Sequence, residues 1–265
     1  MNRPFKRPRV LFFDIETSPM IGYIWGLYDQ NVSLNQIKKD WHVLSWAAKW
    51  QDSKKILYSD QRKCKNIEDD KKILKEIWCL LDSADIVVTQ NGKRFDVKKL
   101  NARFAIHNMK PYSSFKHIDT LLLAKKYFAF TSNKLEYLSN TLNKKYKKLK
   151  HSKFEGFELW KQCLAGNMRA WKEMEKYNKY DVLALEEVYD KLVAWDSSIN
   201  FNLYTDNIVN RCKCGNDKVI RIGFGYTATG KFQRYRCTKC GSETRSRINE
   251  FSKEKRDSLK VSSPR

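Results

Sequence analysis

Apolar runs and alternating positions predict strands at the start of the chain. Residues 10–19, VLFFDIETSP, open with an apolar run that is typical of a buried strand. Residues 20–28 and 41–50 carry aromatic and β-branched side chains at spacings that suit strands, and residues 54–60 predict another short one. Together these segments predict an antiparallel meander beside the first strand.

The apolar period becomes helical after residue 66. Residues 67–84 place apolar side chains on one helical stripe, with acidic residues in the first turn. Residues 85–92 predict a buried strand that ends in a turn, residues 95–111 a helix stopped by Pro111, and residues 117–195 a series of helices. This order predicts an α/β fold in which helices flank a mixed sheet.

The helical period is lost near residue 198, where Ser, Asn and Asp become frequent. We therefore expect a domain of residues 1–198, a linker of residues 199–209, a small domain of residues 210–248 and a basic tail of residues 249–265. A chain of 265 residues is long enough to bury a large core and carry such an appendage.

The charge balance indicates a polyanionic partner. The chain has 52 Lys and Arg against 30 Asp and Glu, a formal net charge of +22. Nucleic acid is favoured because Lys and Arg at phosphates release condensed counterions, and the alternative is a basic protein that is merely soluble. A further basic run, residues 143–153, either lines the path of a strand or forms a solvated surface. The basic N-terminus lacks the apolar segment of a secretory signal, and no apolar run would span a bilayer, so we expect a cytoplasmic protein with no membrane partner.

Paired carboxylates stand at the end of the first strand. Asp14 and Glu16 point to the same face because side chains alternate along a strand. They form either a solvated acidic turn or a site for a hard cation that would neutralise them.

Further acids lie where other elements begin or turn. Asp96 follows a strand and a turn, and it either caps the next helix or joins a site. Tyr177 and Asp181 are four residues apart in a helical stretch, hence on one face. The alternative for this pair is a surface tyrosine beside an ordinary helical aspartate.

Taken in order, the segments FDIET, NGKRFD and YNKYD resemble the motifs of the DEDD superfamily of 3′–5′ exonucleases, which has an RNase H-like fold. The resemblance covers roughly residues 10–195. Tyr177 precedes the last aspartate, and Lys176 stands where the other branch has a histidine, so the chain is similar to the tyrosine branch. That branch includes the proofreading domains of DNA polymerases. The resemblance implies catalytic, metal-binding acids at Asp14, Glu16, Asp96 and Asp181, a catalytic Tyr177, and supporting roles for Asn91 and Asp119.

The resemblance also implies hydrolysis of phosphodiester bonds with two Mg²⁺ or Mn²⁺ ions ~4 Å apart. Asp14 would bridge both ions, Glu16 and Asp181 would complete the first, and Asp96 would reach the second largely through water. Tyr177 would orient the attacking water, because an unperturbed phenol with a pKa of ~10 is a poor base at neutral pH.

Cysteine pairs near the C-terminus predict a second metal site, and their members are Cys212, Cys214, Cys237 and Cys240. Two close pairs, each followed by Gly, are typical of a zinc ribbon, in which the thiolates converge on one structural Zn²⁺. The first pair departs from the usual pattern because a single residue separates its cysteines. Disulfides are the alternative, which a reducing compartment disfavours.

The sequence is compatible with three functions. The first is a metal-dependent 3′–5′ exonuclease acting on DNA, with a ribbon that tethers it to nucleic acid or to a replication partner such as a polymerase. Small phage-encoded exonucleases are similar in layout. The second is an exoribonuclease, and the third is a catalytically silent adaptor that binds nucleic acid. The intact set of acids with Tyr177 favours an enzyme.

Overall fold

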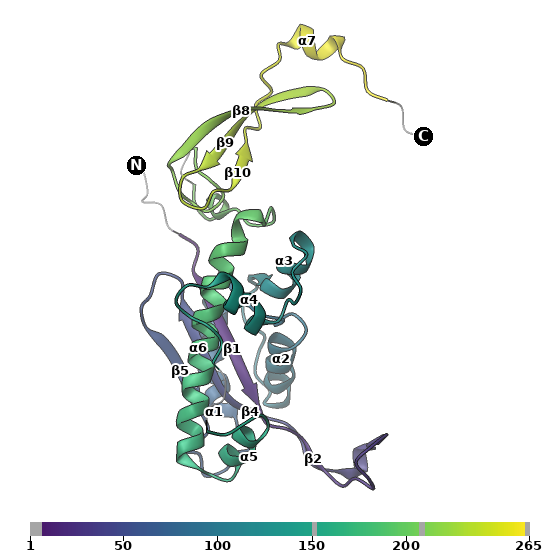
Figure 1. The fold of residues 1–265 in the computed structure, drawn as a ribbon, viewed down its shortest axis with the longest axis vertical. Coiled ribbons are helices and arrows are strands. Elements are labelled where there is room, and N and C mark those ends of the chain that lie inside the picture. Colours follow the sequence, from purple (N-terminus) through teal and green to yellow (C-terminus); the bar gives the residue numbers. More distant parts are fainter. Residues whose placement is uncertain (1–6, 150–152, 207–209, 263–265) are drawn as a thin grey trace. The chain divides into compact units, whose positions relative to one another are not determined.

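The structure is a computed structural model, and it describes residues 7–149, 153–206 and 210–262. The chain divides into two compact units, Arg9–Lys191 and Leu192–Arg265 with Met1–Pro8 (Figure 1). Parts of the expected basic run, linker and basic tail lie outside the described residues.

A five-stranded mixed sheet forms the centre of the Arg9–Lys191 unit. Its strands are β1 (Val10–Thr17), β4 (Val43–Trp50), β5 (Ile56–Asp60), β6 (Ile86–Thr89) and β7 (Lys116–Asp119). Their order is β5-β4-β1-β6-β7, with β4 antiparallel to β1 and β5, and with β6 parallel to β1 and β7. The expected α/β class with a mixed sheet is confirmed.

Helices cover both faces of this sheet (Figure 1). The helices are α1 (Lys71–Asp82), α2 (Asp96–Ile106), α3 (Thr120–Tyr127), α4 (Leu135–Leu142), α5 (Glu158–Leu164) and α6 (Met168–Leu192). Leu11, Phe13 and Ile15 of β1 pack in one buried cluster with side chains of α1 and α2. Phe12 faces the other way, and its ring lies 5.3 Å from that of Tyr189 on α6. Because side chains alternate, Asp14 and Glu16 lie on the face that α6 covers.

The structure differs from the sequence prediction at two strands. Within residues 20–28 only β2 (Ile21–Gly22) is a strand, and it pairs with β3 (Ile37–Lys39) outside the central sheet. The large apolar side chains of residues 20–28 are exposed, so the spacing that predicts a strand is not caused by burial in the sheet. Residues 117–119, predicted as helical, belong to β7, because pairing with β6 outweighs the local pattern of so short a run.

A buried carboxylate joins three elements of this unit. The acids expected in the first turn of α1 instead precede it, with Asp70 at the N-cap. Asp70 accepts hydrogen bonds from the backbone N–H of Val43 at 2.8 Å and from Arg103 Nε at 2.8 Å and Nη2 at 2.7 Å. His107 Nε2 lies 2.7 Å from the same carboxylate. These contacts fix α1 and α2 against the start of β4.

Asp70→Asn is expected to lower the free energy of unfolding by about 3–5 kcal/mol, because it leaves the Arg103 guanidinium buried without its carboxylate. Urea denaturation followed by fluorescence would measure the loss. Glu68→Gln is the matched control, since Glu68 pairs with Lys39 on the surface and such pairs contribute ~1 kcal/mol or less. Equal losses in both variants would contradict the buried network.

A buried histidine on β7 makes stability depend on pH. His117 Nε2 lies 2.8 Å from Thr89 Oγ1, and burial lowers the pKa of His117 from 6.5 to about 4. The unfolded chain therefore takes up this proton first as the pH falls. Stability that is present above pH 6.5 is lost towards pH 4, at up to ~1.4 kcal/mol per pH unit. Unfolding free energies of the parent and of His117→Gln, measured across this range, should diverge; parallel curves would rule out the effect.

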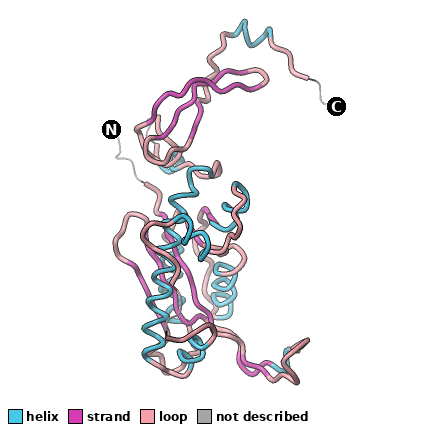
Figure 2. The backbone as a smooth tube through the Cα atoms, in the orientation of Figure 1, coloured by secondary structure: helices cyan, strands magenta, loops and turns pink. Residues whose placement is uncertain are grey.

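The Leu192–Arg265 unit contains a small antiparallel sheet in the order β10-β9-β8. Its strands are β8 (Val219–Thr227), β9 (Gly230–Cys237) and β10 (Glu243–Arg245), preceded by short 3₁₀ turns at Val193–Trp195 and Phe201–Tyr204 and followed by α7 (Lys253–Ser258). Figure 2 shows β8 and β9 as one long hairpin. In the described parts of both units, no helix combines the length and apolar character that crossing a membrane requires.

Candidate active site

The acids of β1 meet polar side chains of α6. Asn178 is fully buried, and its Nδ2 donates to Asp14 Oδ2 at 2.7 Å. Tyr177 and Asp181 neighbour Asn178 on the helix, one turn apart, and both are buried. The third sequence motif therefore lies against the first. Asn178 was not among the predicted residues, although it stands inside the YNKYD segment.

The second motif reaches the same place from α2. Asp96 is the first residue of this helix, and its Oδ1 accepts the backbone N–H of Ile15 at 3.2 Å. Ile15 lies between Asp14 and Glu16, so this contact places Asp96 beside both. Asp96 does not act as the N-cap, which is Phe95.

The shifted pKa values show that these carboxylates affect one another. Burial raises the pKa of Asp14 well above its ordinary value, and Asp96, Glu16 and Asp181 raise it further. Burial, followed by the charge of Asp181, raises the pKa of Glu16 to about 8. Burial also raises the pKa of Asp96 to about 7. Acids held together at such cost favour a bound cation, which would lower all of these pKa values.

A lysine supplies one positive charge to this cluster. Lys148 Nζ donates to Asp181 Oδ2 at 2.6 Å and lies 4.7 Å from the centre of the Tyr177 ring. Burial lowers the pKa of Lys148, but the charges and hydrogen bonds of Asp181 and Tyr177 together outweigh burial, and the pKa is raised. Burial and Asp181 raise the pKa of Tyr177, so its hydroxyl stays protonated. From the sequence, Lys148 belongs only to the basic run of residues 143–153, because no local pattern connects it with Asp181.

Asp119 organises the turn that precedes Asp96. Its carboxylate accepts backbone N–H groups from Asn91 at 2.9 Å and from Lys93 at 3.1 Å, as well as from Leu121 at 3.1 Å. Asn91 has a φ of 65°, a conformation that Asn tolerates better than most residues. Asn91 and Asp119 thus come together as supports of this turn.

Comparison with known proteins identifies the fold. Residues 11–193, more than half of the chain, match the family model of the RNase H superfamily. The chain belongs to the RNase H superfamily. The RNase H-like fold expected from the sequence motifs is therefore confirmed. No curated protein matches the sequence.

A solved structure is similar to this RNase H superfamily member. It is the family B DNA polymerase from the hyperthermophilic archaeon Pyrobaculum calidifontis, with a TM-score of 0.53 and 15% sequence identity. The match covers 71% of this chain and 25% of the polymerase, so the chain spans about a quarter of that protein's length. At this identity the likeness shows the fold.

The superfamily member also carries a cysteine cluster, in its Leu192–Arg265 unit. The Sγ atoms of Cys212, Cys214, Cys237 and Cys240 all lie within 4.8 Å of one another, with Cys212 and Cys240 3.6 Å apart and Cys214 and Cys237 3.7 Å apart. Tetrahedral thiolates at a Zn–S distance of ~2.3 Å would be ~3.8 Å apart, so the cluster fits such an ion. Backbone N–H groups of Lys239 and Cys240 point at Cys237 Sγ, as expected around a thiolate ligand.

Within the described residues, the cysteines are the one group whose potential ligand atoms gather within 4.8 Å. The carboxylate oxygens of Asp14, Glu16, Asp96 and Asp181, which we call the acid cluster, are spread more widely than the cysteine Sγ atoms. The two-ion arrangement implied by the sequence motifs is itself wider than a single four-ligand site. The ammonium of Lys148 also occupies one carboxylate oxygen of Asp181.

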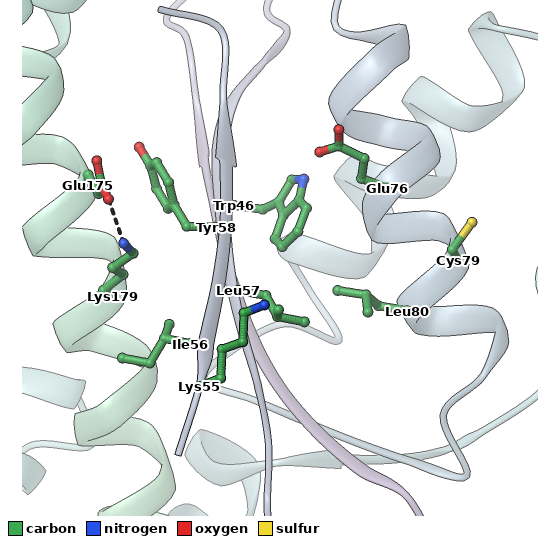
Figure 3. A pocket seen from close by; sticks show the side chains of 10 residues that line it. All are labelled: Trp46, Lys55, Ile56, Leu57, Tyr58, Glu76, Cys79, Leu80, Glu175 and Lys179. Atoms are coloured by element: carbon green, nitrogen blue, oxygen red, sulfur yellow. Dashed lines mark hydrogen bonds and ion pairs between the residues drawn. The ribbon is translucent and has the colours of Figure 1, made fainter. Parts of the chain in front are cut away.

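A separate groove of about 630 Å³ follows the outer edge of β5. Figure 3 shows Ile56 and Tyr58 on the side of α6, and Trp46 and Leu57 on the side of α1. The residues that line it include none of the predicted site residues. Its Glu175 carboxylate is held by Lys179 and Arg62. The acid cluster, not this groove, is therefore the candidate active site.

Proposed function

We propose that this protein is a metal-dependent 3′–5′ exonuclease of the DEDD tyrosine branch that hydrolyses DNA. The observation that carries the proposal is the contact of Asp96 with the backbone between Asp14 and Glu16, together with the contact of Asn178 with Asp14. Three segments far apart in the sequence thereby converge on one carboxylate cluster within an RNase H superfamily domain.

The carboxylates suit hard divalent ions. Asp14, Glu16, Asp96 and Asp181 would hold two Mg²⁺ or Mn²⁺ ions, which when bound would stabilise the charge that develops on the phosphate oxygens. The mutually raised pKa values support this assignment, because neutralising the cluster removes an unfavourable repulsion.

Tyr177 and Lys148 would act on the attacking water and on Asp181. The raised pKa of Tyr177 keeps its hydroxyl protonated, so it donates a hydrogen bond to the water and does not take a proton from it. Lys148 holds Asp181 in place and must release that oxygen when an ion binds there. It then lies free to meet a phosphate oxygen of the substrate.

The ribbon would tether the enzyme to nucleic acid. A structural Zn²⁺ on Cys212, Cys214, Cys237 and Cys240 would hold the sheet β10-β9-β8, whose strands carry Arg221, Arg234, Arg236 and Arg245. A DNA polymerase or another replication protein is the partner that we propose, and the solved polymerase structure of similar fold is the observation that favours it.

End-labelled DNA and RNA strands, incubated with the protein and Mg²⁺, test the proposal together. A ladder that shortens from the 3′ end of DNA is the expected product. Shortening of RNA in preference to DNA would indicate the exoribonuclease. Absence of any metal-dependent product, with binding retained, would leave the silent adaptor and overturn the enzyme.

A further inference from the structure

An apolar arm projects from the RNase H-like unit. We define the arm as residues 20–39, which contain β2, the 3₁₀ turn Leu34–Gln36 and β3. Figures 1 and 2 show it extending away from the end of the sheet where β1 finishes. Its exposed large apolar side chains are Met20, Ile21, Tyr23, Ile24, Trp25, Leu27, Tyr28, Val32 and Leu34. Trp25 is 95% exposed and Tyr28 is 85% exposed, so these rings contact almost nothing in the isolated chain.

Hydrogen bonds from glutamine side chains to the backbone hold the shape of the arm. Gln36 Nε2 donates to the Tyr23 carbonyl at 2.9 Å, while the Tyr23 N–H donates to the Gln36 carbonyl at 2.8 Å. Gln30 accepts the N–H of Trp25 at 3.3 Å and donates to the Tyr28 carbonyl at 2.6 Å. The side chains of Gln30 and Gln36 thus form hydrogen bonds with backbone N–H and carbonyl groups, while the apolar side chains face solvent. An exposed apolar surface of this kind marks a binding site.

The base of the arm is fixed beside the acid cluster. Ser18, two residues after Glu16, donates its N–H to the His42 carbonyl at 2.8 Å and accepts the His42 N–H at its Oγ at 2.9 Å. Tyr23 follows Glu16 by seven residues and Tyr28 follows it by twelve, so their Cα atoms lie no more than ~25 Å and ~43 Å from that of Glu16. A nucleic-acid single strand of several nucleotides, with one end at the acid cluster, is therefore long enough to reach the exposed rings.

The charges favour nucleic acid over a second copy of the chain. The charged residues of the arm are Asp29, Lys38 and Lys39, and the whole chain carries a net charge of +22. Two such chains repel each other, and a polyanion is attracted to either. Aromatic faces bind bases by stacking, which needs no charge on the arm and tolerates any sequence.

We propose that Tyr23, Trp25 and Tyr28 form a platform on which bases of a single-stranded nucleic acid stack while its 3′ end lies at the acids. This inference rests on the proposed function and adds a substrate-holding surface to it. It predicts that long strands bind more tightly than short ones, because only a long strand reaches from the acids to the arm.

The test uses the full chain carrying Asp14→Asn, so that binding is measured without turnover. Combined Trp25→Ala and Tyr28→Ala substitutions are expected to weaken binding of a long oligothymidylate about 10-fold to 100-fold in fluorescence anisotropy. Binding of a dinucleotide should not change. Leu34→Ala is the matched control, since it removes an aliphatic side chain that is 88% exposed but no ring. Trp25→Phe should keep most of the affinity.

The outcomes separate this inference from the proposed function. Unchanged affinity for the long strand in the ring variants would overturn the platform, even if the parent enzyme degrades DNA. An equal loss with Leu34→Ala, or a dimer of the parent in sedimentation that the ring variants abolish, would also overturn it and assign the arm to protein contacts. Weakened binding in the ring variants of a protein that releases no nucleotides would support the platform while refuting the nuclease.

Discussion

Replacing Asp14 with asparagine is expected to slow metal-dependent nucleotide release by about a thousandfold or more. In the proposed mechanism, bound divalent ions would stabilise the phosphoryl transition state by several kcal/mol, and Asp14 would be needed to hold them. Asparagine keeps the shape of the side chain, so the contact from Asn178 can persist and the fold should be retained. Release of labelled nucleotides with Mg²⁺ measures the rate, and anisotropy should show that single-strand binding survives.

Two controls make this result specific. Glu136→Gln removes an exposed carboxylate of α4 outside the cluster and should leave the rate unchanged. Mg²⁺ should also raise the melting temperature of the parent but not of Asp14→Asn, because binding to the native state alone stabilises it. Release of nucleotides by Asp14→Asn at the parent rate would place the chemistry elsewhere.

Removal of a metal from the cysteine cluster is expected to unfold the ribbon and leave the RNase H-like unit intact. In the described residues 210–262, the buried apolar side chains are those of Cys212 and Cys237, so the sheet has little other core. Structural zinc in small domains supplies ~10–16 kcal/mol of apparent binding free energy, which such a sheet cannot replace. Cys237→Ser should therefore lose one Zn²⁺ per chain in elemental analysis and lose the ribbon's dispersed amide signals.

Cys79→Ser provides the comparison for the ribbon. Cys79 is exposed on α1, outside the cluster, and its loss should change neither metal content nor amide signals. A Cys237→Ser protein that keeps its full metal content would contradict the assignment. If the four cysteines of the cluster failed to react with a thiol reagent in a denatured, metal-stripped sample, they would instead form disulfides.

The arm and β7 show where sequence patterns were insufficient. Residues 20–28 have the composition of a strand, yet their apolar side chains lie outside the sheet and only Ile21–Gly22 pairs. The sequence pattern predicts a helix at residues 117–119, and only their pairing with β6 makes them part of a strand. The composition of a segment shows which side chains could be buried. Whether they are buried, and against which strand or helix, depends on the tertiary fold.

The sequence by itself determined the order of the motifs, the shared face of Asp14 and Glu16, and the close pairs of cysteines, because each depends on residues near one another in the chain. The tertiary structure alone decided that Asp96 contacts the backbone of Ile15, 81 residues away, and that Lys148 pairs with Asp181, 33 residues away. Local periodicity carries no information about such contacts. They arise when helices pack on a sheet and bring distant side chains within hydrogen-bonding distance.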